Sequence, residues 1–198
     1  MKFLIFSIGP VQDFIASARK CRDLWFGSWL LSEASRRVAL AITDACGEDA
    51  LVFPGSGNLR GDEAVANKVV ALIDAEAVED VVAACKESCA EFLDEQVDAL
   101  IESRAFRRAT KIGTGPEETL RQQVQDLLES FWVAVPCEAR EGDRYSKARE
   151  RAEELMAARK RTRNWGASTW ASPVPKSSLD GQREAVVCLG KGTDSNKG

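Results

Sequence analysis

The chain has 198 residues, of which 44% are hydrophobic and 29% charged, a composition that suits a globular protein with a core of its own. It contains no histidine, which excludes reactions and metal sites that depend on an imidazole. Its six cysteines form no CxxC pair, and no apolar stretch approaches membrane-spanning length. We therefore expect a cytoplasmic protein with reduced thiols and no membrane contact.

The net charge of −4 is unevenly distributed along the chain. Acidic residues dominate between residues 74 and 98, and basic residues dominate between 144 and 163. The basic stretch ends in Arg159, Lys160, Arg161 and Arg163. Such a run is either a solvated helix face with internal ion pairs or a surface that contacts RNA phosphates or a neighbouring subunit.

The most distinctive pattern lies at the start, in residues 3–31. Residues 3–6 form an apolar run typical of a buried strand, and the following residues 7–10 are predicted to end it. Gly9 permits close backbone approach, and Pro10 suits the first turn of a helix. Helical spacing then predicts helices over 11–18 and from about residue 23 to 42. This turn would place Ser7, Gly9 and Gln12 beside helix N–H groups, where an anion or nucleotide can bind.

The middle of the chain is predicted to be mostly helical. Residues 51–53 form a short strand, and apolar spacing predicts helices over 64–73 and 78–100. Thr114 and Glu117 have the capping-box spacing, so a further helix carrying apolar residues up to Leu128 should begin there. Cys85 and Cys89 lie in the apolar stripe of the helix over 78–100. We expect them to pack in the core, because nothing in the sequence completes a metal site.

The last third of the chain supplies two strands and one helix. Residues 131–135 alternate as a strand does, 144–163 form a mixed-charge helix, and 184–189 are predicted to be the last strand. This order predicts an α+β fold with helices over a small antiparallel sheet. We expect one domain over residues 1–189 with a helical insertion at about 60–130, and a flexible tail over 190–198.

The opening pattern resembles the first palm domain of the large polymerase/cyclase-like subunit in type III, Cmr-type CRISPR effector complexes. The resemblance covers most of the chain and is most specific at its start. It rests on Gly9-Pro10-Val11-Gln12, Phe14-Ile15, Arg19, Arg22-Asp23-Leu24, Gly27-Ser28, Leu30-Leu31, Phe53-Pro54, Ala66-Asn67-Lys68, Ala158 to Arg161, Lys176 to Gly181 and Arg183-Glu184. It implies a ferredoxin-like palm domain in RNA-guided antiviral defence, with guide RNA, target RNA and the other subunits of the complex as partners.

The same resemblance implies ATP, with Mg²⁺ or Mn²⁺, as the ligand between two facing palms. The Gly-Gly-Asp-Asp motif that holds the metal ions in the family's second palm does not occur in this chain. The His-Asp nuclease pair and the zinc-binding cysteines of the family are also missing. We therefore expect no catalytic and no metal-binding residue here, and no activity from this chain alone. A fragment, a split-gene product and a degenerate member all fit this pattern.

The sequence patterns and the resemblance are consistent with two functions of different classes. The first is a non-catalytic palm that contributes to ATP binding through Ser7, Gly9 and Gln12 and to subunit assembly, with the basic residues of 159–163 contacting RNA or a neighbouring subunit. The second is a purely structural interaction module without nucleotide binding. Trp25, Phe26 and Trp29 favour contact with a neighbour, because they are too many aromatics for one core face of a helix. A stand-alone RNA-binding domain is a weaker alternative, since its RNP pattern is absent.

Overall fold

The computed structural model of the chain describes residues 1–12, 16, 18–61, 63–104, 106, 114–162, 176 and 183–186. The chain forms two compact units. The first comprises Met1–Phe92 and Leu127–Ala167, and the second comprises Leu93–Asp126 and Ser168–Gly198. The described helices include none that is long and apolar enough to cross a membrane.

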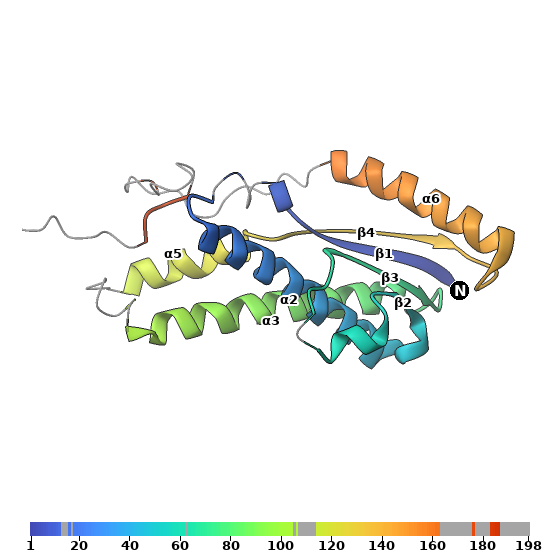
Figure 1. The fold of residues 1–198 in the computed structure, drawn as a ribbon, viewed down its shortest axis with the longest axis horizontal. Coiled ribbons are helices and arrows are strands. Elements are labelled where there is room, and N and C mark those ends of the chain that lie inside the picture. The colour runs from blue at the N-terminus through green and yellow to red at the C-terminus, as the bar shows by residue number, and fades with distance from the viewer. Residues whose placement is uncertain are drawn as a thin grey trace, which may run out of the picture. The chain divides into compact units, whose positions relative to one another are not determined.

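The first unit is built on a four-stranded antiparallel sheet with the strand order β2-β3-β1-β4 (Figure 1). The strands are β1 (Lys2–Gly9), β2 (Leu51–Phe53), β3 (Lys68–Ile73) and β4 (Glu129–Pro136). The predicted strands at 3–6, 51–53 and 131–135 are thus confirmed. The first is longer than predicted, because Ser7, Ile8 and Gly9 continue the pairing with β4 before the chain turns.

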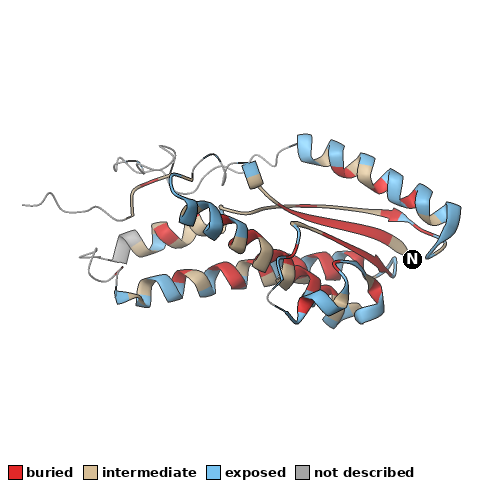
Figure 2. Ribbon diagram, in the orientation of Figure 1, coloured by how far each residue is buried: buried red, intermediate tan, exposed pale blue. Residues whose placement is uncertain are grey.

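The two faces of this sheet carry different helices. Helix α6 (Gly142–Arg161) packs on β1 and β4, where its buried residues Ala148, Ala152 and Met156 meet Phe3 and Ile5. Helix α2 (Cys21–Cys46) packs on β1 and β3. Figure 2 shows the buried positions of α6 on its sheet-facing side and the exposed ones on the opposite side. The α+β prediction with a small antiparallel sheet is therefore confirmed.

Helix α3 (Val78–Glu102) begins in the first unit, where it packs on α2. The thiol sulfurs of Cys85 and Cys89 lie 3.9 Å from the carbonyl oxygens of Val38 and Ala34, respectively. Both cysteines are buried, as predicted. Burial is the main cause that raises the pKa of each thiol from 9.0 to about 12. These thiols are therefore core residues that stay protonated at neutral pH.

One prediction in this unit is wrong: residues 64–73 do not form a helix. Residues 63–67 have no regular structure, and 68–73 form β3, which lies between β2 and β1. The five apolar residues 69–73 are all buried. An inner strand is covered on both faces, so its sequence is a continuous apolar run that a helical pattern also fits.

The second unit contains the end of α3 and helix α5 (Thr114–Gln125). Its buried cluster consists of Val97, Phe106 and Leu120. The helix predicted from Thr114 is confirmed, but it ends at Gln125, before Leu127 and Leu128. Of the predicted strand at 184–189 only residues 184–186 are described, and Glu184 there forms an isolated bridge with Lys176. The predicted tail at 190–198 and most of the helix at 11–18 lie outside the described residues.

Candidate functional site

The Gly9 end of the sheet is formed by the last residues of β1 and the first residues of β3 and β4. Antiparallel pairing places Ser7 of β1 opposite Lys68 of β3 on one side and opposite Phe131 of β4 on the other. Residues separated by more than 120 positions in the chain are therefore neighbours at this end. The opening turn, here meaning residues 9–12, leaves the sheet at this point.

Ser7 is fully buried, and its hydroxyl is already engaged within the protein. Its Oγ donates a hydrogen bond of 3.1 Å to the carbonyl oxygen of Asn67, which also accepts one of 3.0 Å from the backbone N–H of Ile8. The Asn67 side-chain amide donates in turn to the carbonyl of Ile8 at 3.0 Å. This geometry favours a structural role for Ser7 in joining β1 to the start of β3. The sequence reasoning did not single out Asn67 for this role.

Gly9 and Gln12 are placed differently from Ser7. Gln12 is exposed and forms no hydrogen bond with a described residue. Gly9 does not have a positive φ, and a Cβ atom added to it would find only the backbone nitrogen of Val11 within 4 Å, at 3.9 Å. The described part of the chain therefore does not itself require glycine at this position. A ligand or partner that approaches the turn closely would supply a reason for it.

A groove of about 330 Å³ lies beside the opening turn, between the start of α2 and residues 64–67. Its lining is mostly apolar and includes Val11, Leu24, Gly27, Ser28, Leu31, Ser32 and residues 64–67. The side chain of Ser32 fixes one wall, because its Oγ accepts a 2.7 Å hydrogen bond from the backbone N–H of Val65. We call this cavity the α2 groove.

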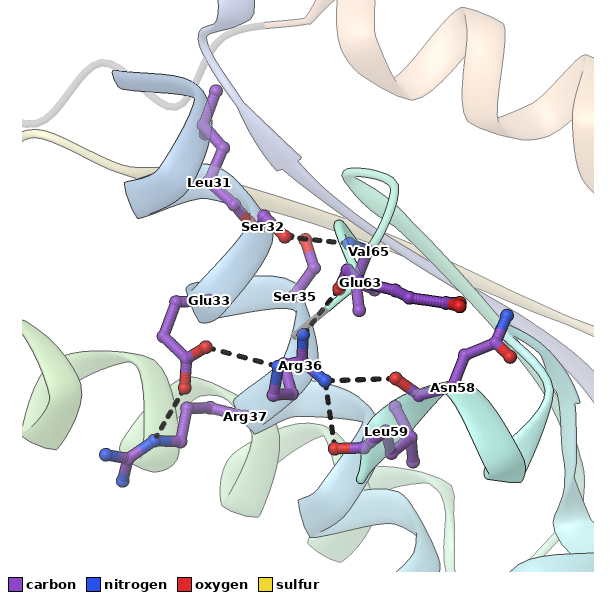
Figure 3. Close-up of polar contacts among 10 residues, drawn as sticks. All are labelled: Leu31, Ser32, Glu33, Ser35, Arg36, Arg37, Asn58, Leu59, Glu63 and Val65. Carbon is purple, nitrogen blue, oxygen red and sulfur yellow. Dashed lines mark hydrogen bonds and ion pairs between the residues drawn. The ribbon is translucent and has the colours of Figure 1, made fainter. Parts of the chain in front are cut away.

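Arg36 holds the chain segment that leads into the α2 groove (Figure 3). Its guanidinium donates hydrogen bonds to the carbonyl oxygens of Asn58 at 3.0 Å, Leu59 at 2.9 Å and Glu63. Glu33, three residues earlier on α2, accepts from its Nε at 3.2 Å and orients it. These charge-assisted bonds anchor the loop between β2 and β3 on α2.

The basic end of α6 lies at the Gly9 end of the sheet. The guanidinium of Arg159 is 5.5 Å from the ring centre of Phe131, which pairs with Ser7. Partial desolvation by neighbouring atoms, followed by the charge of Lys68, lowers the pKa of Lys160, although its side chain is still exposed to solvent. Lys68 itself forms a 2.7 Å ion pair with Glu153 of α6. Arg161 is exposed, and Arg163 lies outside the described residues.

The two sets of predicted contact residues are therefore gathered at one end of the sheet. The exposed groups there are the Gln12 amide and the cationic side chains of Lys160 and Arg161. These groups fit a phosphate, which prefers amide and cationic donors. Within the described residues no three cysteine or carboxylate side chains come together in a way that could hold a metal ion.

The start of α2 exposes several large apolar side chains. Trp25 is 67% exposed, Phe26 50% and Leu24 45%, whereas Trp29 is half-buried against Phe92 with their ring centres 6.0 Å apart. Leu24 is exposed although it fits the apolar spacing that predicts this helix. Asp23 caps this helix end by accepting hydrogen bonds from the backbone N–H groups of Arg19 and Lys20. We call Leu24, Trp25 and Phe26 the α2 aromatic surface.

Comparison with known proteins gives one family assignment. No curated protein matches the chain. The family described as CRISPR-associated protein Cmr2, N-terminal, matches residues 3–164, which is most of the chain. The match covers nearly all of the first unit. This family supports the resemblance to the large subunit of type III, Cmr-type complexes. The chain belongs to the family of the N-terminal part of CRISPR-associated protein Cmr2.

Proposed function

We propose that this chain is a non-catalytic palm of the large subunit in a cytoplasmic type III CRISPR complex. In this proposal the opening turn contacts the phosphates of ATP bound between this palm and a catalytic one. The basic end of α6 contacts the RNA of the complex or a neighbouring subunit. The sheet with the order β2-β3-β1-β4 is compatible with a ferredoxin-like palm, since the described strands and α-helices run β1-α2-β2-β3-α3-α5-β4 before α6. This is the β-α-β-β-α-β order of that fold with two helices, α3 and α5, in place of the second one.

The observation that carries the proposal is the convergence at the Gly9 end of the sheet. The opening turn, Lys68 and the last turn of α6 come from three distant parts of the chain, and pairing and packing bring them together. Lys68 is neutralised by Glu153, but Lys160 and Arg161 leave exposed positive charge there although the chain as a whole has a net charge of −4. A local cationic surface on an acidic protein favours a specific anionic ligand over general attraction to nucleic acid.

A second candidate is an interaction module without nucleotide binding. The α2 aromatic surface favours it, because exposed Trp and Phe side chains next to one another are typical of protein contact sites. The internal hydrogen bond of Ser7 also agrees with it, since this hydroxyl is not free for a ligand. The two candidates differ in ATP binding, which only the first requires.

The opening turn offers a direct test with a matched control. Gly9→Val should leave the fold intact, because a Cβ atom has room there, but should reduce ATP affinity by about tenfold or more if the turn approaches phosphates closely. Gly55→Val is the control, since a Cβ atom added to Gly55 also has open space and Gly55 is not part of the opening turn. ATP binding should be measured on the full chain, alone and with a catalytic palm supplied, beside thermal melts.

The outcomes separate the two candidates. If Gly9→Val lowers the affinity for ATP but keeps the melting temperature, this result supports the nucleotide-binding palm. Gln12→Ala should then also lower the affinity for ATP. If the unaltered chain binds no ATP in either setting, the interaction module is the correct function. In both cases we expect no nucleotide product from the chain by itself, because it carries no Gly-Gly-Asp-Asp motif.

A further inference from the structure

A second groove lies on the other face of the sheet, between α6 and the β2-β3 edge. Its volume is about 360 Å³, and its lining consists of Phe3, Val52, Phe53, Lys68, Val70, Tyr145, Arg149 and Glu153. We call it the α6 groove. It shares no lining residue with the α2 groove, so it is a separate site within the first unit.

The walls of the α6 groove are aromatic and partly fixed. Phe3 and Val70 form a buried apolar floor. The Tyr145 ring packs edge-on against Phe3, with ring centres 5.5 Å apart, so the floor holds it in place. Phe53 lies on the edge strand β2 and is 44% exposed. A large apolar side chain on an open sheet edge is unusual, and its free ring surface suits stacking with a flat ligand.

The rim of the groove carries an uncompensated positive charge. Lys68 and Glu153 neutralise each other through their 2.7 Å ion pair. Arg149, one helical turn before Glu153 on α6, is exposed and has no ion pair or hydrogen bond with any described residue. Its guanidinium is therefore available to an anion, and it presents the donor geometry that phosphates match.

We propose that the α6 groove binds one nucleotide, with the base against Phe53 and Tyr145 and a phosphate at Arg149. The volume is at the lower end of the about 300–1,000 Å³ that small-molecule sites occupy, which suits a single nucleotide unit. Aromatic side chains stack on bases of any sequence, and an arginine beside them binds the backbone phosphate. The nucleotide is either free or one residue of a single-stranded RNA, since both present the same base and phosphate.

Tyr145 gives a reporter that is specific to this groove, because it is the only tyrosine in the chain. The experiment uses the full chain with ring-labelled tyrosine, and follows the Tyr145 NMR signal during separate titrations with AMP, adenosine, inorganic phosphate and a short oligoadenylate RNA. We expect a saturable shift with AMP or with the RNA, because a stacked base shifts the resonances of a neighbouring ring. Adenosine should bind more weakly than AMP by about tenfold, since it lacks the phosphate contact.

Two variants and two controls complete the test. Phe53→Ala and Arg149→Gln should each raise the dissociation constant by about tenfold, and Arg149→Gln should leave adenosine binding unchanged. Arg151→Gln removes the same charge from α6 at an exposed position that does not line the groove, and Phe26→Ala removes a phenylalanine of similar exposure elsewhere. Both controls should bind like the unaltered chain, and thermal melts establish that all four variants fold.

The possible results divide clearly. A shift with both AMP and RNA supports the proposal, and a shift with only one of them supports it and identifies the source of the nucleotide. A Tyr145 signal that moves with neither AMP nor the RNA overturns it, as does a dissociation constant for the bound nucleotide that either Arg149→Gln or Phe53→Ala leaves unchanged. Gly9→Val should not alter the Tyr145 titration, so this result is independent of the nucleotide site proposed at the opening turn.

Discussion

The contact between Ser7 and Asn67 determines how the opening turn leaves the sheet. Three hydrogen bonds link Ser7 and Ile8 to Asn67, and they fasten the end of β1 to the residue before β3. Ser7 was predicted to contact nucleotide because it precedes a turn between a strand and a helix. Its burial follows from its place in the inner strand β1. The sequence alone does not show on which face of the sheet the Ser7 side chain lies.

Ser7→Ala tests this structural role. The substitution removes one donor, but the Asn67 carbonyl keeps its bond to the Ile8 N–H, so the free energy of unfolding should fall by only about 0.5–1.5 kcal/mol. The affinity for ATP should not change, because the hydroxyl does not face solvent. Urea unfolding and ATP titration measure the two quantities. A folded Ser7→Ala chain that has lost ATP affinity would show that Ser7 contacts the ligand after all.

The buried thiols of Cys85 and Cys89 predict how stability depends on alkaline pH. Their pKa is 9.0 in the ordinary state and about 12 in the fold, so the unfolded chain ionises first. The stabilisation is fully present below pH 9 and is lost as the pH rises toward 12. At pH 10, about one unit above the ordinary value, each thiol should lower the free energy of unfolding by roughly 1–2 kcal/mol.

Urea unfolding at pH 7 and pH 10 measures this effect. The stability of Cys85→Ala should fall less between the two pH values than that of the unaltered chain. Cys21→Ala is the control, because Cys21 is exposed, and it should keep the full pH dependence. If Cys85→Ala loses as much stability on going to pH 10 as the unaltered chain does, the Cys85 thiol is not shielded in the fold.

At the scale of elements, amphipathic helices are predicted well from the sequence, and inner strands are predicted poorly. Helices α2 and α3 were predicted because each has an apolar stripe and a polar face. Helix α6 was predicted from its run of mixed charges. Strand β1 was recognised because a Gly-Pro turn follows it directly. Strand β3 was mistaken for a helix because nothing comparable ends its apolar run, and its partner β1 lies some 60 residues away in the chain. Local spacing holds no information about that pairing.

The assignment of the buried side of helix α3 can be tested by two substitutions. Leu93 is buried and Lys86 is exposed on the same helix. Leu93→Ala should lower the free energy of unfolding by roughly 2–5 kcal/mol through lost burial and the cavity left behind, and Lys86→Ala by less than about 0.5 kcal/mol. Equal shifts in thermal melts of the two variants would show that the buried side of α3 is assigned wrongly.

At the scale of the whole molecule, the sequence predicts the separate parts of the candidate site. It does not predict that the fold brings these parts close together. Gly9, Gln12 and the basic end of α6 were identified separately, from a turn pattern and a charge run. Their convergence depends on β4 pairing with β1 and on α6 returning across that pair. The ion pair of Lys68 with Glu153 and the α6 groove could not be predicted either, because 85 residues separate the two partners. Family membership was predictable, since it rests on motifs that are contiguous in sequence.

Substitutions at the basic end of α6 test, by a change of charge alone, whether the Gly9 end of the sheet contacts phosphates. Lys160, Arg161 and Arg163 are changed together to Gln, and Arg159 is left in place because it stacks on Phe131 and so supports the fold. The control changes Arg144, Lys147 and Arg151 to Gln, which removes the same charge from the first half of the same helix. Melting temperatures of both variants should stay close to that of the unaltered chain, since the described members of both sets are exposed and exposed charges contribute little to stability.

The deciding measurement is the dependence of single-stranded RNA affinity on salt concentration for the full chain and these two variants. If the Gly9 end of the sheet contacts phosphates, the Lys160/Arg161/Arg163 variant binds RNA more weakly and its salt dependence is flatter, by about 0.7 in the logarithmic slope for each lost phosphate contact. The Arg144/Lys147/Arg151 control keeps the slope of the unaltered chain. Equal affinities and parallel slopes for all three proteins would contradict the account and leave this end of α6 as an ordinary solvated surface.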